Sequence, residues 1–496
     1  MRPWRNWHTR TFEGRVGDRT SSSLVGRTKT VTTECTRCGE GNRWFFISLS
    51  DWQGMDMSDY NHYRPFGISR DVFELSEEAM RLARDAFVRV DEIREKRQLE
   101  VLRSFMESRV SESAFMAKTG YGYGDVGREK AEAVFAYAFG AEDALVRLQF
   151  GSGTHVLATC LRALLNDGDE LLIVTGRPYD TLLPTLGMVK DALTDQRLYP
   201  GDTFTISRQA LSSRGVSIRQ LELTEEETPD LASIRACVKP DTRMVYIQKS
   251  RGYSERRALV AEDIASIVHV VREVSRDTII FVDNCYGEFV EPVEPTRVGA
   301  DLIAGSLIKN PGAGIAPSGG YIAGKAVLIE EIADCMTAVD VGRHVGPSLG
   351  FSRLLLEGLY FAPSVTASAM KGAIHLGALF SLAGYMCSPS IDDVRGDIVQ
   401  TVRLDESRAL EAFCRAIQAS SPVDSFVTPA PAPMPGYDCD IIMASGSFVQ
   451  GSTIELSADG PLRPPFIAFV QGGLTFENAR LGAMKALESL RQFEGM

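Results

Sequence analysis

Residues 302–324 read LIAGSLIKNPGAGIAPSGGYIAG. The apolar run Leu302–Gly305 predicts a short buried strand, and Lys309 follows it in a loop that residues 310–312 (NPG) keep from continuing as a helix. A lysine in such an apolar loop is not expected to be a solvated surface charge. Desolvation is expected to lower the pKa of its amine and to make the amine a nucleophile towards an aldehyde.

The same kind of short apolar run recurs through the middle of the chain and alternates with amphipathic helices. Strands are predicted at residues 144–150, 171–175, 217–223, 244–248, 279–283, 301–305 and 319–323, and the helices between them include 153–165 and 262–274. This alternation favours a mostly parallel sheet that helices cover on both faces. The predicted fold class is α/β, with a large domain built on a mostly parallel seven-stranded sheet.

The sequence on either side of this region has a different arrangement of predicted helices and strands. Beyond about residue 350 we predict helices at 365–385, 403–418 and 475–492 and strands at 453–457 and 466–470, which form a smaller α+β domain. Ahead of the strands, Ser76 is expected to cap a helix on which Leu82, Ala86 and Val90 recur at helical spacing. The expected organisation is an N-terminal helical segment at 55–125, a large domain at 126–350 and a small domain at 351–496.

Residues 1–54 differ in composition from the rest of the chain. All four tryptophans lie within the first 52 residues, and the first 50 residues carry nine Lys or Arg against four Asp or Glu, whereas the whole chain has a net charge of −12. We interpret residues 1–54 as a non-native or disordered extension, so that a chain beginning at Met55 should fold and function; an organelle transit peptide is the alternative. Cys35 and Cys38 form a lone CxxC, half of what a structural zinc site needs, and we expect no metal.

Composition limits the kinds of partner. The net charge of −12 argues against nucleic acid, which asks for a basic face. No uninterrupted apolar run approaches the ~18–20 residues of a membrane span, so no membrane partner is expected. Nine cysteines scattered through a long chain indicate reduced thiols and a cytoplasmic protein.

The polar residues that follow the predicted strands form a constellation, because ligands of open parallel sheets bind at the carboxyl ends of the strands. Gly151-Ser152-Gly153-Thr154 joins a strand to a helix whose N-terminus is suited to a phosphate. Tyr179 follows the strand 171–175, and Asp283 ends the strand 279–283. Taken singly, these are also readable as a tight turn, a packing aromatic and a helix cap or loop carboxylate.

Together with Lys309 these residues meet the needs of one cofactor, pyridoxal phosphate (PLP). In this interpretation the 151–155 turn holds the phosphate and Tyr179 covers the ring. Asp283 keeps the pyridine nitrogen protonated, and Lys309 forms the Schiff base. No other lysine is expected at a strand end in this constellation.

Six segments of the chain carry a resemblance to a known family. They are GYGYGDVGR (120–128), VRLQFGSGTH (146–155), IQKSRGY (247–253), FVDNCYGEFVEP (281–292), LIAGSLIKNPGAGIAPSGGYIAG (302–324) and SFVQGSTIELSADGPLRPP (447–465). From about residue 70 to 495 the chain resembles the cystathionine β-lyase / methionine γ-lyase-like family often called aluminium-resistance proteins. The resemblance implies the type I fold of PLP-dependent transferases, PLP as cofactor and a homodimer or homotetramer.

The resemblance also implies roles for further residues. Ser306 resembles a serine that helps to hold the phosphate, while Ile308 replaces a common hydroxyl residue. Ser250 stands near the position of an asparagine that contacts the cofactor in related lyases, and Arg251 beside it is a candidate for substrate binding. Arg463 is a second candidate for the substrate carboxylate, with an exposed loop arginine as the alternative interpretation.

Tyr121, Tyr123 and Arg128 resemble the Tyr/Arg element that reaches the phosphate of a neighbouring subunit. The implied function is carbon–sulfur bond elimination on an amino acid, with Lys309 and Tyr179 as catalytic residues and a thiol leaving from Cβ or Cγ. An aminotransferase on the same fold shares these residues and is the alternative. A non-catalytic regulator would require a damaged site. The substrate and the choice between β- and γ-elimination stay open.

Overall fold

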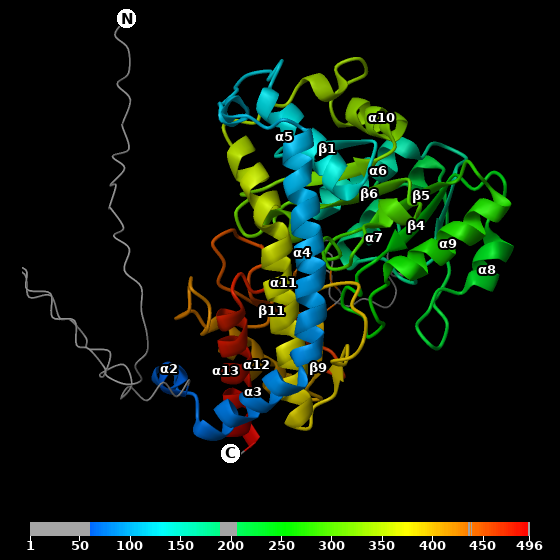
Figure 1. The fold of residues 1–496 in the computed structure, drawn as a ribbon. Coiled ribbons are helices and arrows are strands. Elements are labelled where there is room, and N and C mark those ends of the chain that lie inside the picture. The colour runs from blue at the N-terminus through cyan, green and yellow to red at the C-terminus, as the bar shows by residue number, and fades with distance from the viewer. Residues whose placement is uncertain (1–59, 189–205, 435–436, 438, 495–496) are drawn as a thin grey trace, which may run out of the picture. The chain divides into compact units, whose positions relative to one another are not determined.

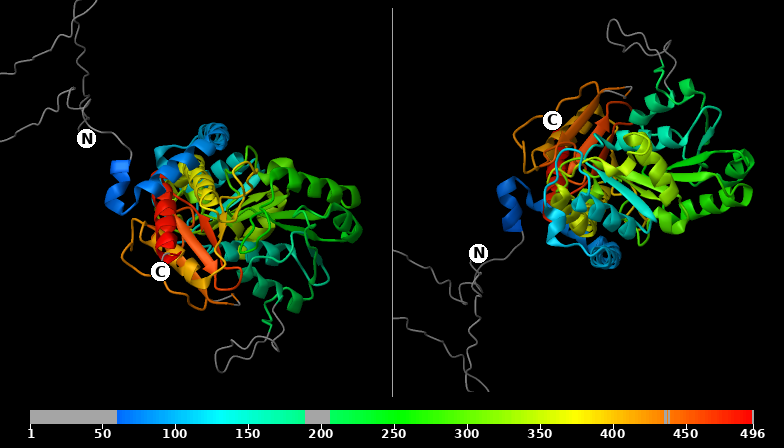
Figure 2. Two further views of the ribbon diagram at one scale, coloured as in Figure 1. Left: turned by 90° about the horizontal axis from the view of Figure 1, so that it is seen from below. Right: turned by 90° about the horizontal axis from the view of Figure 1, so that it is seen from above.

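Two separate β-sheets organise the part of the chain that the structure describes, which is residues 60–188, 206–434, 437 and 439–494. The structure is a computed structural model. The expected extension at residues 1–54, with its CxxC, lies outside the described residues. The two sheets belong to different stretches of sequence, and Figure 2 shows the green and cyan strands of one apart from the orange and red strands of the other.

The first sheet has seven strands in the order β1-β7-β6-β5-β4-β2-β3. They are β1 (Asp143–Arg147), β2 (Glu170–Ile173), β3 (Ser217–Gln220), β4 (Met244–Gln248), β5 (Ile279–Asp283), β6 (Leu302–Ser306) and β7 (Gly320–Gly324). β7 is antiparallel to both of its neighbours, and the pairs from β6 to β3 are parallel. The prediction of a mostly parallel seven-stranded sheet is confirmed.

Helices cover both faces of this sheet because alternate residues of each strand point to opposite faces. On β4, Val245 and Ile247 pack into a core with α5 (Val126–Phe139) and α9 (Ala261–Val274), and α8 (Leu231–Cys237) lies on the same side. Met244 and Tyr246 of the same strand pack instead with α6 (Gly153–Leu164), α7 (Leu183–Leu186) and α10 (Ala326–Met336). A strand buried on both faces needs apolar residues at every position, which is why these strands could be predicted from continuous apolar runs.

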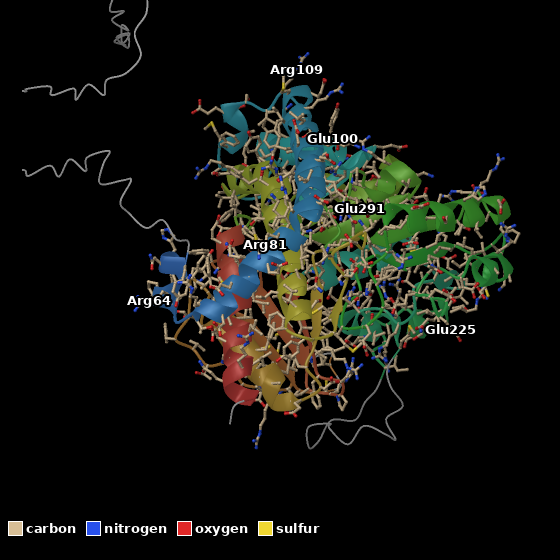
Figure 3. All side chains as sticks on the ribbon, turned by 60° about the horizontal axis from the view of Figure 1, so that its bottom comes forward. Arg64, Arg81, Glu100, Arg109, Glu225 and Glu291 are labelled. Carbon is tan, nitrogen blue, oxygen red and sulfur yellow. The ribbon has the colours of Figure 1, made fainter. Side chains whose placement is uncertain are left out.

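A helical segment precedes the sheet and consists of α2 (Tyr60–Tyr63), α3 (Arg70–Leu82) and α4 (Arg84–Glu107). In Figure 3 the labels Arg81, Glu100 and Arg109 follow its course. The prediction that Ser76 caps a helix is wrong. Ser69 is the cap and accepts from Val72 N, whereas Ser76 is buried within α3 and hydrogen-bonds His375 at 2.9 Å. The residues ahead of Ser76 already recur at helical spacing, so the helix begins about two turns earlier.

Long helix α11 (Ser352–Leu382) runs beside α4 and leads into the second sheet (Figure 1). It begins 13 residues before the predicted 365–385 and continues through Pro363. Its length and composition would suffice to cross a membrane, but 72% of its most apolar window is buried inside the structure. This burial is what a core helix of a folded domain requires, since its small residues let neighbouring elements approach closely.

The second sheet has five antiparallel strands in the order β10-β11-β12-β9-β8. They are β8 (Cys387–Ser388), β9 (Gln400–Arg403), β10 (Ile441–Ser445), β11 (Ser457–Pro461) and β12 (Ile467–Gln471), packed against α12 (Ser407–Gln418) and α13 (Phe476–Glu494). The predicted α+β character is confirmed, but β8, β9 and β10 were not predicted. The predicted strand at 453–457 was placed four residues too early.

Candidate active site

A cavity of about 290 Å³ opens at the carboxyl ends of the parallel strands, between the seven-stranded sheet and the small-domain sheet. The structure brings nine of the sequence-predicted site residues into its lining. They are Gly151, Ser152, Gly153, Thr154, Tyr179, Ser250, Asp283, Ser306 and Lys309. These residues come from five segments of the chain, and the parallel strands are what carry them to one edge.

Lys309 follows β6 and precedes a short 3-10 turn at Asn310–Gly312. Its side chain is half-buried, and its Nζ lies 4.0 Å from the ring centroid of Tyr286. Burial acts to lower the pKa of Lys309, but the neighbouring groups Cys285, Tyr286, Asp283 and Glu288 outweigh it and raise the pKa. The expectation of a lowered pKa is therefore wrong for the protein alone, because desolvation is not the only influence on this amine. Lys309 is held as an ammonium ion.

Asp283 is the last residue of β5, next to β6 in the sheet, and is buried. Its Oδ1 accepts from the backbone N of Cys285 at 3.1 Å, and its Oδ2 accepts from the hydroxyl of Tyr246 at 3.3 Å. Burial raises the pKa of Asp283, and the positive charge of Lys309 acts against that rise. The opposite charges of Asp283 and Lys309 therefore attract each other along the same wall of the cavity.

The predicted phosphate turn opens helix α6. Ser152 is the N-cap and accepts from His155 N at 3.1 Å, while the imidazole of His155 accepts from Gly151 N at 3.1 Å. The first N–H groups of a helix have no acceptor within it, so those of Gly153 and Thr154 are available to an anion. A Cβ on Gly153 would lie 3.5 Å from Ser306 Cβ, so the absent side chain leaves room between the turn and Ser306.

Tyr179 enters the cavity from the loop after β2. Its backbone N donates to Gln248 Oε1 at 2.7 Å, and its hydroxyl lies 2.5 Å from that of Tyr437. Burial raises the pKa of Tyr179 well above the ordinary value for tyrosine. The side chain is therefore a neutral phenol near neutral pH, able to donate a proton or a hydrogen bond.

Ser250 lines the cavity, but its hydroxyl donates to Asp397 Oδ2 of the small domain at 2.8 Å. Arg251 turns away from the cavity. Its guanidinium donates to Ser388 O at 3.3 Å and to Thr401 Oγ1 at 3.4 Å. The prediction that Arg251 binds substrate is not supported, because its donors link the loop after β4 to the strands of the small domain.

Arg463 is exposed in the turn between β11 and β12 and does not belong to the cavity lining. It lies four residues beyond Asp459, the last residue of this strand region to reach the cavity. The alternative interpretation, an exposed loop arginine, therefore fits its position. Among the described residues that line the cavity, Lys309 is the one basic side chain.

The segment at 120–128 divides into exposed and internal residues. Tyr121 and Tyr123 are 74% and 63% exposed, with ring centroids 5.7 Å apart. Arg128 is buried, and its Nη1 donates to the carbonyls of Gly122 and Gly346 at 3.0 Å. The prediction that Arg128 reaches a neighbouring subunit is wrong for this structure, because its guanidinium holds the loop of its own chain.

Sequence reasoning missed several residues of the cavity, among them Tyr286 and Asp459. Tyr286, three residues after Asp283, adopts a left-handed φ of +70°, which places its ring under the Lys309 amine. Asp459 on β11 lines the opposite wall. The signal for Asp459 was its place in the SADGP run, but the strand predicted at 453–457 stopped short of it.

Comparison with known proteins points to one family. The family model described as methionine gamma-lyase matches residues 72–491. The uncharacterized protein YnbB of Bacillus subtilis is 42% identical over 403 residues, which are 81% of this chain and 92% of that protein.

Solved structures give the same result. A carbon–sulfur lyase involved in aluminum resistance from Clostridium novyi NT is 42% identical, with a TM-score of 0.81 over 88% of this chain and 100% of that one. A candidate cystathionine beta-lyase involved in aluminum resistance from Clostridium acetobutylicum is 40% identical, with a TM-score of 0.81 over 88% and 99% of the two chains. The PLP-dependent protein YhfS of Escherichia coli shares the fold at 17% identity, with a TM-score of 0.52 over 81% and 97% of the two chains.

Proposed function

Because the chain belongs to the methionine gamma-lyase family, we propose that it is a PLP-dependent carbon–sulfur lyase that releases a thiol from a sulfur-containing amino acid. The observation that carries the proposal is that one cavity joins Lys309, Asp283 and the N-terminus of α6. Each of these groups suits a different part of one cofactor. Their convergence is more specific than any of them alone.

The residues of the cavity fit PLP in chemistry. The N–H groups of Gly153 and Thr154 and the hydroxyls of Ser152 and Ser306 suit a phosphate. The Asp283 carboxylate suits a protonated ring nitrogen, and the Lys309 amine suits an aldehyde. When bound, the cofactor supplies an aldehyde for the lysine and a ring that accepts electrons from the substrate Cα.

The protein's own groups then divide the proton transfers. Lys309 is the one basic side chain of the described lining, so it is suited to take the proton from Cα once its attachment to the cofactor has removed its own proton and the substrate amine has displaced it. Tyr179 stays a neutral phenol because burial raises its pKa. It is therefore suited to donate a proton to the departing sulfur.

The described lining offers a phosphate hydrogen-bond donors but no second cation beside Lys309. A phosphate dianion held without a second cation still has oxygens that can accept hydrogen bonds, and a phenol can donate to one of them. We therefore propose a homodimer or homotetramer in which Tyr121 or Tyr123 of one subunit completes the site of another. The exposure of Tyr121 and Tyr123 supports this proposal, because both phenols can contact another subunit, whereas Arg128 is buried.

The test is a screen of the purified protein against cystathionine, cysteine, methionine and their homologues, with thiol, keto acid and ammonia measured together. A lyase releases all three in equal amounts. Lys309→Ala is the matched control and should release none. Keto acid formed without thiol, and only when a second keto acid is added, would show an aminotransferase and overturn the proposal.

A further inference from the structure

We infer that Glu288, which lies behind β6, is a positioning residue that takes up a proton when Lys309 gives up its own on attachment to the cofactor. The inference rests on the PLP site of the proposed function and adds a residue that does not line the cavity. Its consequence is that the charge around Lys309 stays balanced when the ammonium ion is lost.

The carboxyl group of Glu288 occupies a closed niche against β6. Glu288 is fully buried, and its Oε1 accepts from the hydroxyl of Tyr321 on β7 at 2.9 Å. Its Oε2 has no hydrogen-bond partner among the described residues. A Cβ on Gly305 of β6 would lie 2.6 Å from Oε1, so the absent side chain makes room for the carboxyl group. A buried carboxylate with one neutral donor is costly, and a proton removes that cost.

The segment that carries Glu288 is fastened to the segment that carries Lys309. Asn310, the next residue, donates from its Nδ2 to the carbonyl oxygens of Tyr286 at 3.1 Å and of Glu288 at 3.0 Å. The Nζ of Lys309 lies 4.0 Å from the centroid of the Tyr286 ring. Lys309 therefore rests on the same turn that holds the Glu288 carboxyl group in place.

Lys309 and Glu288 act on each other electrostatically. The positive charge of Lys309 acts to lower the pKa of Glu288, and the negative charge of Glu288 helps to raise the pKa of Lys309. Burial is the stronger influence on Glu288 and raises its pKa to about 8. The carboxyl group therefore gains and loses its proton close to neutral pH. Its pKa rises further when the charge of Lys309 is removed.

Other titratable and charged groups surround Glu288. Those that act on it or respond to its charge are Lys249, Cys285, Glu294, Lys309 and Tyr321. The Cys285 thiol and the Tyr321 phenol are neutral near neutral pH, because burial raises the pKa of both groups. They therefore provide no charge that could balance the Glu288 carboxylate.

Two of the remaining groups belong to ion pairs that attachment of the cofactor leaves intact. Glu294 Oε1 lies 2.6 Å from Arg97 Nη2, and Lys249 Nζ lies 2.8 Å from Glu291 Oε2. Lys309 is the one group of this set whose charge is removed by attachment. The protonation of Glu288 is therefore expected to follow the charge of Lys309.

Attachment removes that charge by a balanced reaction. The amine nitrogen forms a C=N bond to the aldehyde carbon, the carbonyl oxygen leaves as water with two of the ammonium protons, and the third proton is released. Above about pH 8 Glu288 is a carboxylate before attachment, and it takes up a proton when the positive charge beside it disappears. Below that pH it already holds a proton and takes up none.

The test counts the protons released when PLP binds to the protein freed of cofactor. Calorimetry in buffers of different ionisation enthalpy gives this count at each pH. At about pH 9, Glu288→Gln should release up to about one proton more than the unaltered protein, because the amide cannot take one up. At about pH 6.5 the two counts should agree, since Glu288 is then protonated whether or not Lys309 is charged. A role in folding alone would not produce a difference that appears only at the higher pH.

Two further variants make the test specific to the carboxyl group. Tyr321→Phe keeps that group but removes its hydrogen bond, so the pKa of Glu288 should rise and proton uptake should begin at a higher pH. Glu225→Gln alters an exposed carboxylate and should match the unaltered protein at every pH.

The proton count needs no turnover, which separates this inference from the proposed function. A protein that binds PLP but cleaves no thioether contradicts the proposed function and leaves the proton count to decide the role of Glu288. A protein that binds no PLP overturns both. Equal counts for Glu288→Gln and the unaltered protein at about pH 9 overturn the inference alone.

Discussion

Two lysines, the buried Lys249 and the half-buried Lys309, follow strands on either side of β5, and only Lys309 faces the cavity. Lys249 directly follows β4 but does not line the cavity, so among the described residues Lys309 is the one strand-end lysine of the predicted constellation. The Nζ of Lys249 lies 2.8 Å from Glu291 Oε2 and donates to the Gly287 carbonyl at 3.3 Å. Lys309 lies over Tyr286 at the cavity instead.

The difference teaches what makes a strand-end lysine functional. Burial lowers the pKa of both amines, and acidic neighbours, led by Glu291 for Lys249 and by Cys285 for Lys309, raise both again. The direction of the pKa therefore does not separate the two residues. What separates them is access, because Lys249 is fully enclosed by its partners while Lys309 opens onto space that a ligand can fill.

The largest expected effect comes from Lys309→Ala. It should abolish the visible absorbance of the bound cofactor and reduce turnover by about 10⁴-fold or more, because both attachment and proton transfer depend on this amine. Borohydride reduction of the unaltered protein followed by peptide mapping should label Lys309. A label on Lys249 would reverse the comparison.

Lys249→Met should instead act on stability. Removing one partner of a buried ion pair leaves the other charge unpaired and costs about 3–5 kcal/mol of the free energy of unfolding. Chemical denaturation measures this loss, and Lys249→Met/Glu291→Leu should recover most of it (Glu291 is labelled in Figure 3). The folded fraction of either variant should still bind cofactor. Loss of cofactor in a folded variant would mean that Lys249 belongs to the active site.

Much of the large domain could be predicted from the sequence, because its strands are buried on both faces and read as apolar runs. The pattern also predicted which polar residues lie at the carboxyl ends of these strands, and Asp283 and Lys309 line the cavity there. It gave no way to tell Lys249 from Lys309. Both follow apolar runs, and the difference depends on Glu291 and Gly287, which approach Lys249 only in the folded chain.

The small-domain wall was harder to predict for a physical reason. Asp459 lies on a strand of small and polar residues, Ser457–Pro461 (SADGP), which neither periodicity nor β-propensity marks. Arg463 was proposed to bind the substrate carboxylate because of its positive charge. The charge of a residue does not determine which way its side chain points. Arg128 shows the same limit, since its guanidinium is used by carbonyls within its own chain.

Glu288 lies among the groups that act on both lysines and gives a pH-dependent test. Burial raises the pKa of Glu288 to about 8 from 4.5, so the folded protein binds this proton more tightly than the unfolded chain. The stability that the proton provides is complete below pH 4.5 and is lost as the pH rises through about 8.

In Glu288→Gln the fall in the free energy of unfolding over that pH range should shrink, by on the order of a few kcal/mol. Denaturant unfolding at a series of pH values measures it. Glu225→Gln, which alters an exposed carboxylate (labelled in Figure 3), is the control and should leave the profile unchanged. A Glu288→Gln profile as steep as that of the unaltered protein would place the proton elsewhere.

The smallest expected effect concerns the exposed end of the site. Gly122 has a φ of +70°, and a Cβ there would lie 2.7 Å from Pro347 Cα, so the loop is pinned to its own chain while Tyr121 and Tyr123 project outward. If these phenols complete a neighbour's phosphate site, Tyr121→Ala/Tyr123→Ala should weaken cofactor binding by about tenfold or more, the loss of one charged hydrogen bond. At a cofactor concentration that leaves this variant largely unloaded, mixing it with Lys309→Ala should then restore about a quarter of full activity, because half of the exchanged dimers are mixed and each has one intact site of two. Separately tagged subunits verify the exchange. Two results would show that each subunit completes its own site: no recovery of activity after verified exchange, or an active monomer in sedimentation. The cavity that Lys309 faces, and from which Lys249 is enclosed, would then be complete within a single chain.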